Sequence, residues 1–399
     1  MISRIKDEAS PHPHAETAVS FADQWFPEAM FYAYLFISAF AYAILYIPNM
    51  APALLSATAL IASLKSPSRL KWLLLPALTL SIMAIIDFLG YRGDMETIKS
   101  YLFWTLMFAV CLVLHEDPGF FDRAKNVLAI YLLCHFFFLQ ASPVDENRLG
   151  LSEKMSISNP NDLGYWCAFG VFMSLIASIR SSGLKRVLYS SFALIALIVL
   201  FRTVSRSALI FLAFSVATYL FLSIRERGRF YSILFVLILL AVSGLAFKHF
   251  LSEGMQAYRH RMEYEEDKGN YSFSGRTYYL QEGIRAVIAS PWYGTGEDEI
   301  SPREASKPSA APHNVFVAVA LHYGIWPTLF LAILWLITLV RAISLTFWAA
   351  ESRRHDQSNE LFAFTLFLFL MSNVSNKMML APFCVLYMTK VLTAGSIRE

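Results

Sequence analysis

Residues 231–247, YSILFVLILLAVSGLAF, form an apolar run without a charged side chain. Apolar and polar residues do not alternate in it, as they do along the strands of outer-membrane β-barrels. A run of this length comes close to crossing the hydrocarbon core of a bilayer as a helix. A helix also satisfies its own backbone hydrogen bonds in lipid. The stretch therefore predicts a helical membrane protein.

The remainder of the chain has the same character. Hydrophobic residues make up 56% of its 399 residues and charged residues 16%, whereas soluble domains carry about 25% charged residues. The apolar runs that we assign as spans are 29–48, 51–64, 72–90, 100–115, 126–142, 163–179, 187–201, 207–223, 230–249, 314–347, 360–373 and 378–395. The predicted fold is all-α, a polytopic membrane protein of about twelve transmembrane helices.

The charges of the short loops predict the orientation of these spans. Four loops are rich in lysine and arginine, and such loops stay in the cytoplasm. They are 65–71, 180–186, 225–229 and 351–355. With an even number of spans, both termini are cytoplasmic, so that 1–28 is a cytoplasmic tail and 29–399 is a single transmembrane domain. The same orientation sends a large loop, 250–313, to the outer face, where we expect it to contain short helices.

Neither the cysteines nor the acidic residues point to a metal site. The four cysteines lie inside apolar runs, which predicts small core residues rather than disulfides or zinc ligands. They are Cys111, Cys134, Cys167 and Cys384. The acidic stretch 263–268 has no recognised ligand spacing, and we interpret it as a solvated face. The sequence therefore predicts no metal and no cofactor.

Arg202 and Arg206, in LFRTVSRSALIF, lie at the predicted outer end of a span. They are four residues apart, so a continuous helix would place both on one face. Arginine beside hydrocarbon is costly unless it pairs or faces water. One interpretation is that both side chains reach up to phospholipid headgroups. The other is that they clamp a phosphate group, for which the planar guanidinium fork is suited.

Two arginines of the outer loop lie within one predicted helix. The sequence GRTYYLQEGIRAVIASPWYGTG (275–296) predicts a short amphipathic helix at the membrane interface. Arg276 and Arg285 are nine residues apart, so a regular helix directs them to opposite faces. At most one of them can point at a shared site. The GTG that follows is by itself very weak evidence for a phosphate-binding loop.

His313 and Asn314 stand where the loop meets a long apolar run, in SAAPHNVFVAVALHYGIWP (309–327). His313 opens a helix whose N-terminal amides favour anions, and it shares the predicted outer face with the four arginines. Neighbouring guanidinium groups favour the neutral imidazole near pH 7, as a general base requires. The alternative is a polar residue that only ends the loop. His322, in mid-helix, is interpreted as a core histidine.

Taken together, four motifs resemble those of the O-antigen ligase and O-antigen polymerase superfamily of bacterial envelope glycosyltransferases. They are NPNDLGYW (159–166), SRSALIFLA (205–213), the loop helix running into SPWYGTG, and HNVFVAVALHYGIWP. The span from Arg285 to Gly296 also fits the arginine–glycine pattern described for the polymerases. The resemblance covers roughly residues 155–330, with the motifs in the family's order.

The resemblance implies a membrane-embedded glycosyltransferase of the C type in the bacterial inner membrane. Such an enzyme uses undecaprenyl diphosphate-linked glycans at the periplasmic face, without a metal. The resemblance also implies that Arg206 and one loop arginine hold the diphosphate, and that His313 assists the acceptor hydroxyl. The predicted catalytic residues are therefore His313, Arg206 and Arg285, and the predicted substrate-binding residues are Arg202, Arg276, Asn161 and Asn314.

We expect the ligase activity, which transfers a polymerised glycan from undecaprenyl diphosphate onto the lipid A–core oligosaccharide. One dominant outer loop with one arginine–glycine pattern resembles the ligases more than the polymerases. The expected partners are this donor, this acceptor and membrane lipids, and no nucleic acid. A polymerase of the same superfamily is the first alternative. The alternative from another class is a transporter, which would place charged groups near the bilayer midplane, where the predicted spans have almost none.

Overall fold

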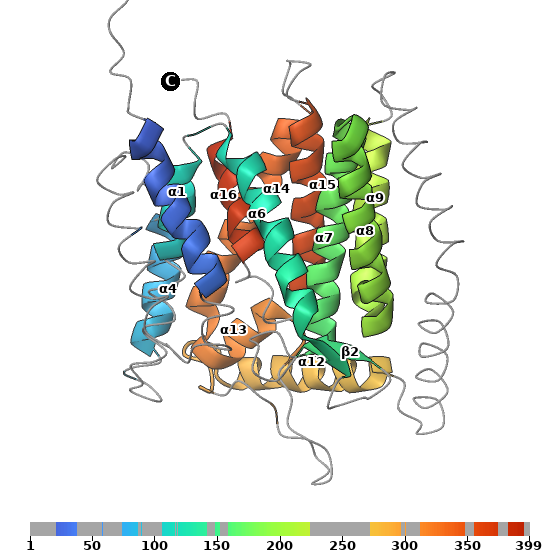
Figure 1. The fold of residues 1–399 in the computed structure, drawn as a ribbon. Helices are drawn as coiled ribbons and strands as arrows, with labels where there is room; N and C mark the ends of the chain where they lie inside the picture. Colours follow the sequence, from blue (N-terminus) through green and yellow to red (C-terminus); the bar gives the residue numbers. More distant parts are fainter. Residues whose placement is uncertain are drawn as a thin grey trace, which may run out of the picture.

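The structure is a computed structural model in which most helices pack side by side and α12 lies across one end of the bundle (Figure 1). It describes residues 21–37, 58, 74–86, 89, 106–115, 117, 119–141, 148–151, 159–223, 272–296, 300, 312–347, 355–373 and 382–394. The helices are α1 (Phe21–Phe36), α4 (Leu74–Ile86), α6 (Phe120–His135), α7 (Pro160–Arg180), α8 (Gly183–Thr203), α9 (Arg206–Ser223), α12 (Ser272–Ala289), α13 (Val315–Tyr323), α14 (Ile325–Phe347), α15 (His355–Ser372) and α16 (Pro382–Thr393). Residues 106–114 are also helical. The predicted span 230–249 and almost all of 51–64 lie outside the described residues.

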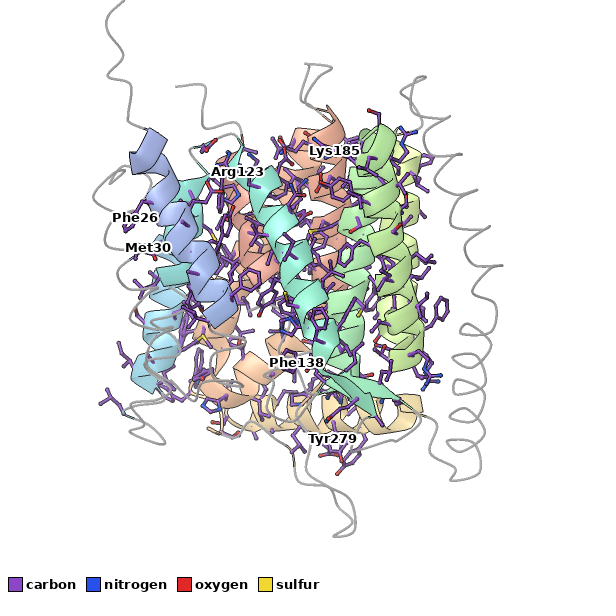
Figure 2. All side chains as sticks on the ribbon, in the orientation of Figure 1. Phe26, Met30, Arg123, Phe138, Lys185 and Tyr279 are labelled. Atoms are coloured by element: carbon purple, nitrogen blue, oxygen red, sulfur yellow. The ribbon has the colours of Figure 1, made fainter. Side chains whose placement is uncertain are left out.

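The two ends of the bundle carry different segments. Helices α12 and α13 lie at one end, which we call the α12 end (Figure 1). Arg123 and Lys185 lie at the opposite end, which we call the basic end (Figure 2). The α7–α8 junction, which contains the basic stretch 180–186, is also at the basic end. The bundle therefore separates this basic loop from the segment 275–296 that was predicted to lie on the outer face.

Among the described residues, four helices are long and apolar enough to cross a membrane by length and composition, namely α7, α8, α9 and α14. The first three confirm that the predicted spans 163–179, 187–201 and 207–223 are long apolar helices. Of the most apolar 18-residue stretch of α7, 89% is buried inside the protein, whereas the corresponding share in the other three helices is 28–33%. An apolar helix that is buried on all sides is a central helix. Helix α7 is thus central, and α8, α9 and α14 present apolar surface outward.

Aromatic rings fill the space around α7. Phe169 stacks on Phe383 of α16 with ring centroids 4.3 Å apart, and Phe364 of α15 lies 3.8 Å from Tyr387. All four rings are buried, and each such pair adds about 0.5–1.5 kcal/mol beyond the burial of its area. The four cysteines are free, three of them buried and Cys134 partly buried. Cys111, Cys167 and Cys384 are thus core residues, as the sequence predicted.

The boundary predicted for the N-terminal tail, residues 1–28, is wrong. Helix α1 begins at Phe21 and already includes Glu28. Glu28 is 4% exposed, because Arg123 of α6 binds its two carboxylate oxygens at 2.8 and 2.6 Å. Tyr32 donates a third hydrogen bond at 2.6 Å. These contacts pack the end of the supposed tail against α6 as part of a helix.

The predicted span 126–142 is wrong at its C-terminal end. Helix α6 ends at His135, a 3-10 turn follows (Phe136–Phe138), and the chain continues as strand β1 (Leu139–Ala141). Strand β1 pairs antiparallel with β2 (Leu149–Leu151), which packs against α7. The pairing satisfies backbone groups that a continued helix would have bonded internally. The all-α prediction therefore has one exception among the described residues, a small hairpin at the α12 end (Figure 1).

The predicted span 314–347 is two helices, and the single span was wrong. Helices α13 and α14 are separated by Gly324, whose φ is +83°. A positive φ with an extended ψ of −169° ends a right-handed helix, and glycine adopts that conformation without a steric penalty. The Ile325 amide then donates to the Pro291 carbonyl at 2.8 Å instead of continuing the helix. Of these two helices, only α14 has the length of a membrane span.

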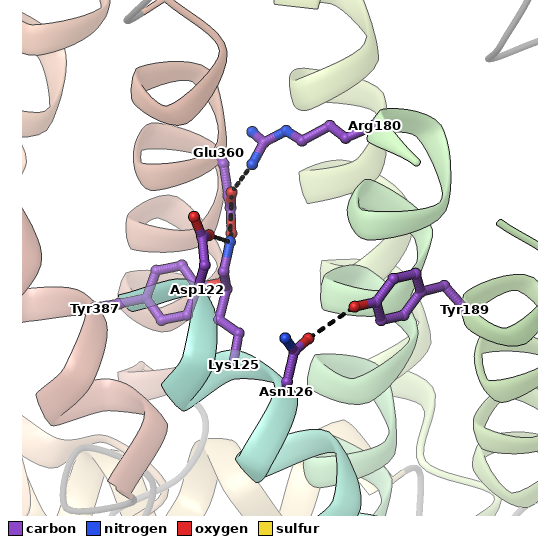
Figure 3. A network of polar contacts seen from close by, with 7 residues as sticks. All are labelled: Asp122, Lys125, Asn126, Arg180, Tyr189, Glu360 and Tyr387. Atoms are coloured by element: carbon purple, nitrogen blue, oxygen red, sulfur yellow. Dashed lines mark hydrogen bonds and ion pairs between the residues drawn. The ribbon is translucent and has the colours of Figure 1, made fainter. Parts of the chain in front are cut away.

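Glu360 of α15 is fully buried at a point where four helices meet (Figure 3). Its carboxylate accepts hydrogen bonds from Lys125 of α6 at 2.9 Å and from Arg180 of α7 at 2.5 Å. The Tyr387 hydroxyl of α16 donates another at 2.8 Å. A buried carboxylate is very costly unless it is paired and hydrogen-bonded. The network therefore fastens α6, α15 and α16 to the end of α7 at the basic end of the bundle.

We predict that Glu360→Gln destabilises the protein, because Lys125 and Arg180 then remain largely buried without this counter-ion. Breaking a buried pair in this way costs about 3–5 kcal/mol. Glu282→Gln is the matched control, since its partner Arg285 is 63% exposed, and an exposed pair contributes about 0–1 kcal/mol. Thermal unfolding of the detergent-purified chain measures both variants. Equal unfolding midpoints would contradict the role of Glu360.

Candidate active site

The Arg202–Arg206 segment is a turn between two helices at the α12 end. Helix α8 ends at Thr203, and α9 begins at Arg206. Val204 between them is left-handed, with φ 53° and ψ 35°, which ends α8. The prediction that the two arginines share one helix face is therefore wrong. Both side chains are partly buried, one at the end of α8 and the other at the start of α9.

The N-terminus of α7 packs directly against this turn. A Cβ on Gly164 would lie 2.5 Å from the Ser205 Cβ and 2.8 Å from the Thr203 Oγ1, so only glycine permits this approach. One residue further along α7, the Tyr165 hydroxyl and the Ser207 hydroxyl are 2.7 Å apart. The motifs NPNDLGYW and SRSALIFLA are thus in contact, which explains why a glycine lies in the first of them.

Arg148, which precedes β2, joins the same two segments, and the sequence reasoning missed it. It is 7% exposed. Its Nε donates to the Thr203 carbonyl at 2.8 Å, and its Nη2 donates to the Asn161 Oδ1 at 2.8 Å. The planar guanidinium group makes both bonds at once, which an ammonium group does poorly. Arg148 therefore fixes the backbone that carries Arg202 and Arg206.

The two asparagines predicted to bind substrate both make hydrogen bonds within the protein. Asn161 accepts from Arg148, as described above. Asn314 caps α13, because its Oδ1 accepts from the backbone amides of Phe316 at 3.0 Å and Val317 at 3.1 Å. Its Nδ2 donates to the Oδ1 of Asn373, just beyond α15, at 3.1 Å. In this arrangement Asn314 holds the start of α13 in place.

Helix α12 packs against the start of α13 through Gly283. A Cβ there would lie 3.0 Å from the Val317 Cγ1 and 3.4 Å from the Pro312 Cβ. Arg285, two residues on, is on the other side of α12, where it is 63% exposed and pairs with Glu282 at 2.6 Å. Position 276 lies about two helical turns before Gly283 and so occupies the α13-facing side. The register therefore places position 276, and not 285, toward the bundle.

The segment that follows α12, SPWYGTG (290–296), is bonded to the α13–α14 junction by its backbone. The amides of Thr295 and Gly296 donate to the carbonyls of Leu321 at 2.6 Å and His322 at 3.2 Å. Gly294 has φ +73°, and a Cβ on it would lie 2.6 Å from the His322 carbonyl oxygen. A close backbone approach thus explains Gly294, and a φ of +73° explains Gly296. They need no phosphate-loop interpretation.

His313 immediately precedes the cap Asn314 and is partly buried. Its neighbour Pro312 faces Gly283, so His313 lies next to the middle of α12. His322 is different, because it is 2% exposed and packs on Tyr323 with ring centroids 4.1 Å apart. That placement agrees with the interpretation of His322 as a core residue. His313, α12 and the Arg202–Arg206 turn thus all lie at the α12 end of the bundle (Figure 1).

Residues 191–333 match the family model described as O-Antigen ligase. The match begins within α8 and ends within α14, so it includes the Arg202–Arg206 turn, α12 and His313. The resemblance drawn from the sequence motifs is confirmed over this region. Proteins of this family are O-antigen ligases and polymerases, which transfer glycosyl groups. A comparison with curated proteins finds no match.

Arg148 lies before the matched O-antigen ligase region, and its role can be tested without an activity assay. We predict that Arg148→Lys and Asn161→Ala are non-additive in thermal unfolding, because each removes the same hydrogen bond. Residues in one network show coupling energies of about 0.5–3 kcal/mol, whereas distant pairs add within about 0.3–0.5 kcal/mol. Arg148→Lys with Glu282→Gln is the distant control pair. Additive effects in both cycles would show that Arg148 does not fix the turn through Asn161.

Proposed function

We propose that this chain is a ligase that transfers a polymerised glycan from undecaprenyl diphosphate to the lipid A–core oligosaccharide. The observation that carries the proposal is the gathering of arginine-bearing segments and His313 at one end of an apolar helical bundle. The matched O-antigen ligase region contains all of these segments. We propose that the α12 end faces the periplasm and the basic end the cytoplasm, as the positive-inside rule favours.

The proposed chemistry is a displacement at the anomeric carbon of the lipid-linked glycan. Diphosphate is the leaving group, and its developing negative charge requires fixed cations rather than a proton. Arginine supplies such cations with a donor fork that matches phosphate oxygens. A single displacement by the acceptor hydroxyl inverts the anomeric centre. The donor's lipid tail would reach the site laterally, between apolar helices.

Within this scheme, we assign the α12 cation to Arg276 in preference to Arg285. Position 276 is on the α13-facing side of α12, and Arg285 is on the exposed side and paired with Glu282. Arg206 is the second cation, at the start of α9, and Arg202 flanks it. His313 is the proposed general base, which takes the proton from the acceptor hydroxyl. Asn161 and Asn314 support the site by holding the turn and the start of α13.

The proposal is tested by supplying the purified chain with an undecaprenyl diphosphate-linked glycan and a lipid A–core acceptor. We expect glycan-capped acceptor to form, and to form equally well after EDTA treatment. Loss of transfer on chelation, with recovery on adding Mg²⁺, would overturn the arginine mechanism. Elongation of the lipid-linked glycan in place of transfer to the acceptor would identify the polymerase alternative. Movement of the donor across vesicles without glycosyl transfer would favour a transporter.

The first prediction of the proposed mechanism concerns the arginines. Arg206→Lys and Arg276→Lys keep a charge but lose the donor fork, so transfer per folded protein should fall by roughly 10²-fold or more. Arg285→Lys is the matched variant on the opposite side of the same helix and should keep near-normal transfer. The reverse result for the two α12 variants would return the role to Arg285. Normal transfer by all three variants would leave no arginine clamp.

A second prediction concerns His313. The variants His313→Asn and His313→Gln remain polar but cannot accept a proton near pH 7, so transfer should fall by roughly 10²–10⁴-fold. The amount of folded protein, measured by size-exclusion chromatography, should stay normal, because Asn314 provides the α13 cap. His322→Gln serves as a comparison and should retain its transfer per folded molecule. Near-normal transfer by His313→Gln would mean that the histidine only ends the loop.

A further inference from the structure

A cavity of about 240 Å³ lies between α6, α7 and α8 at the basic end, far from the α12 end. Its walls include Lys125 and Asn126 of α6, Ser174 and Arg180 of α7, and Tyr189 of α8. Asn126 and Tyr189 point toward each other, and the Tyr189 hydroxyl donates to the Asn126 Oδ1 at 2.9 Å (Figure 3). The volume equals that of roughly eight water molecules in the liquid, enough for a small polar group.

The charges beside the cavity balance. Lys125 contacts the carboxylates of both Asp122 and Glu360 at 2.9 Å, and Arg180 contacts Glu360 at 2.5 Å. Within this ion-pair network two cations therefore meet two carboxylates, so the network itself offers an added anion no net positive charge. Asp122 is 65% exposed, whereas Glu360 is sealed behind the network. The cavity thus offers an accessible carboxylate near one end and guanidinium and hydroxyl groups near the other.

Ser174 supplies an independent sign that the cavity takes a ligand. It is 2% exposed, and its Oγ has no hydrogen-bond partner among the residues that the structure describes. A serine in a helix can usually satisfy its hydroxyl on a preceding backbone carbonyl. Leaving a buried hydroxyl unbonded costs about 1–3 kcal/mol. A polar group in the cavity would remove that cost, because Ser174 lines it.

The surroundings of the cavity favour a lipid over a free solute. Ile130, one turn beyond Asn126 on α6, is 54% exposed, and Ile195 on α8 is 45% exposed. Both follow the polar lining in the direction of the bundle centre, along helices of which α7 and α8 have the length of membrane spans. Exposed apolar side chains in that position suit acyl chains. A headgroup in the cavity would leave its chains against them.

We propose that this cavity binds the headgroup of a zwitterionic phospholipid with a primary amine, of the phosphoethanolamine type, at the membrane edge. The phosphate lies toward Arg180 and Ser174, and the ammonium group donates to Asp122 and Asn126. The balanced charges favour a zwitterion over an anionic headgroup. A quaternary ammonium group has no N–H to donate, so a phosphocholine headgroup forms fewer hydrogen bonds. The site is separate from the proposed glycan transfer and does not depend on it.

The test is binding of defined lipids to the detergent-purified full-length chain, followed by native mass spectrometry and by thermal unfolding. We expect phosphatidylethanolamine to bind roughly tenfold or more tightly than phosphatidylcholine or phosphatidylglycerol, the difference of about one charge-assisted hydrogen bond. Equal binding of the three lipids would overturn the proposal. Soluble phosphoethanolamine that raised the unfolding midpoint as much as the lipid would also overturn it, since the chains would then contribute nothing.

Two variants and a control localise the binding. Ser174→Leu fills the cavity, and Asp122→Asn removes the accessible carboxylate while keeping its size, so both should lose the preference for phosphatidylethanolamine. Lys185→Gln, at the same end of the bundle but outside the lining, should keep it. If Ser174→Leu does not fold, Asp122→Asn still decides, because its side chain is mostly exposed. A preference retained by Asp122→Asn would place the lipid elsewhere.

Discussion

A carboxylate sealed among four helices is stable only while its neighbours neutralise it, and Glu360 imposes that condition on the described bundle. Lys125, Arg180 and Tyr387 come from three different helices, and none of them can leave without exposing a buried charge. The aromatic rings around α7 can pack in several relative orientations, whereas the hydrogen bonds of this network require one arrangement of the side chains. It therefore sets the register in which α6, α15 and α16 pack against α7. Because α7 extends to the α12 end, the network also fixes the position of the α7 N-terminus there.

At that opposite end, the motifs that are loose in the sequence become contacts. Gly164 allows α7 to meet the turn before α9, and Gly294 allows the segment after α12 to meet the end of α13. Arg148 stabilises the first of these contacts by hydrogen bonding to the Thr203 carbonyl, and Asn314 caps the start of α13. The proposed glycosyl transfer needs its cations and its base at fixed separations. Small residues and main-chain hydrogen bonds provide that spacing.

The sequence predicted what depends on local composition and missed what depends on distant partners. Helices α7, α8 and α9 follow from apolar runs, which need no tertiary information. The break at Gly324 could not be predicted in this way, because one glycine barely changes the hydropathy of a long run. The cause of the break is a contact with residues around 291–296. Arg148 was missed because its partners are 13 and 55 residues away. Arg202 and Arg206 were found by residue type, but their helical relation was misjudged because the left-handed Val204 carries no sequence signature. The amphipathic loop helix was predicted correctly, and the choice between its two arginines required the position of Gly283.

The attachment of the segment 290–296 to the α13–α14 junction is made largely by main-chain atoms, which every amino acid possesses, and the Thr295 hydroxyl adds a hydrogen bond of 3.1 Å to the Leu321 carbonyl. Besides the glycines, only a few side chains take part, among them Trp292, which stacks on Trp326 of α14. For the proposed glycosyl transfer, such a joint separates the surface that meets the sugar from the spacing of the reacting groups. A joint built from peptide groups lets selection alter the first property without disturbing the second.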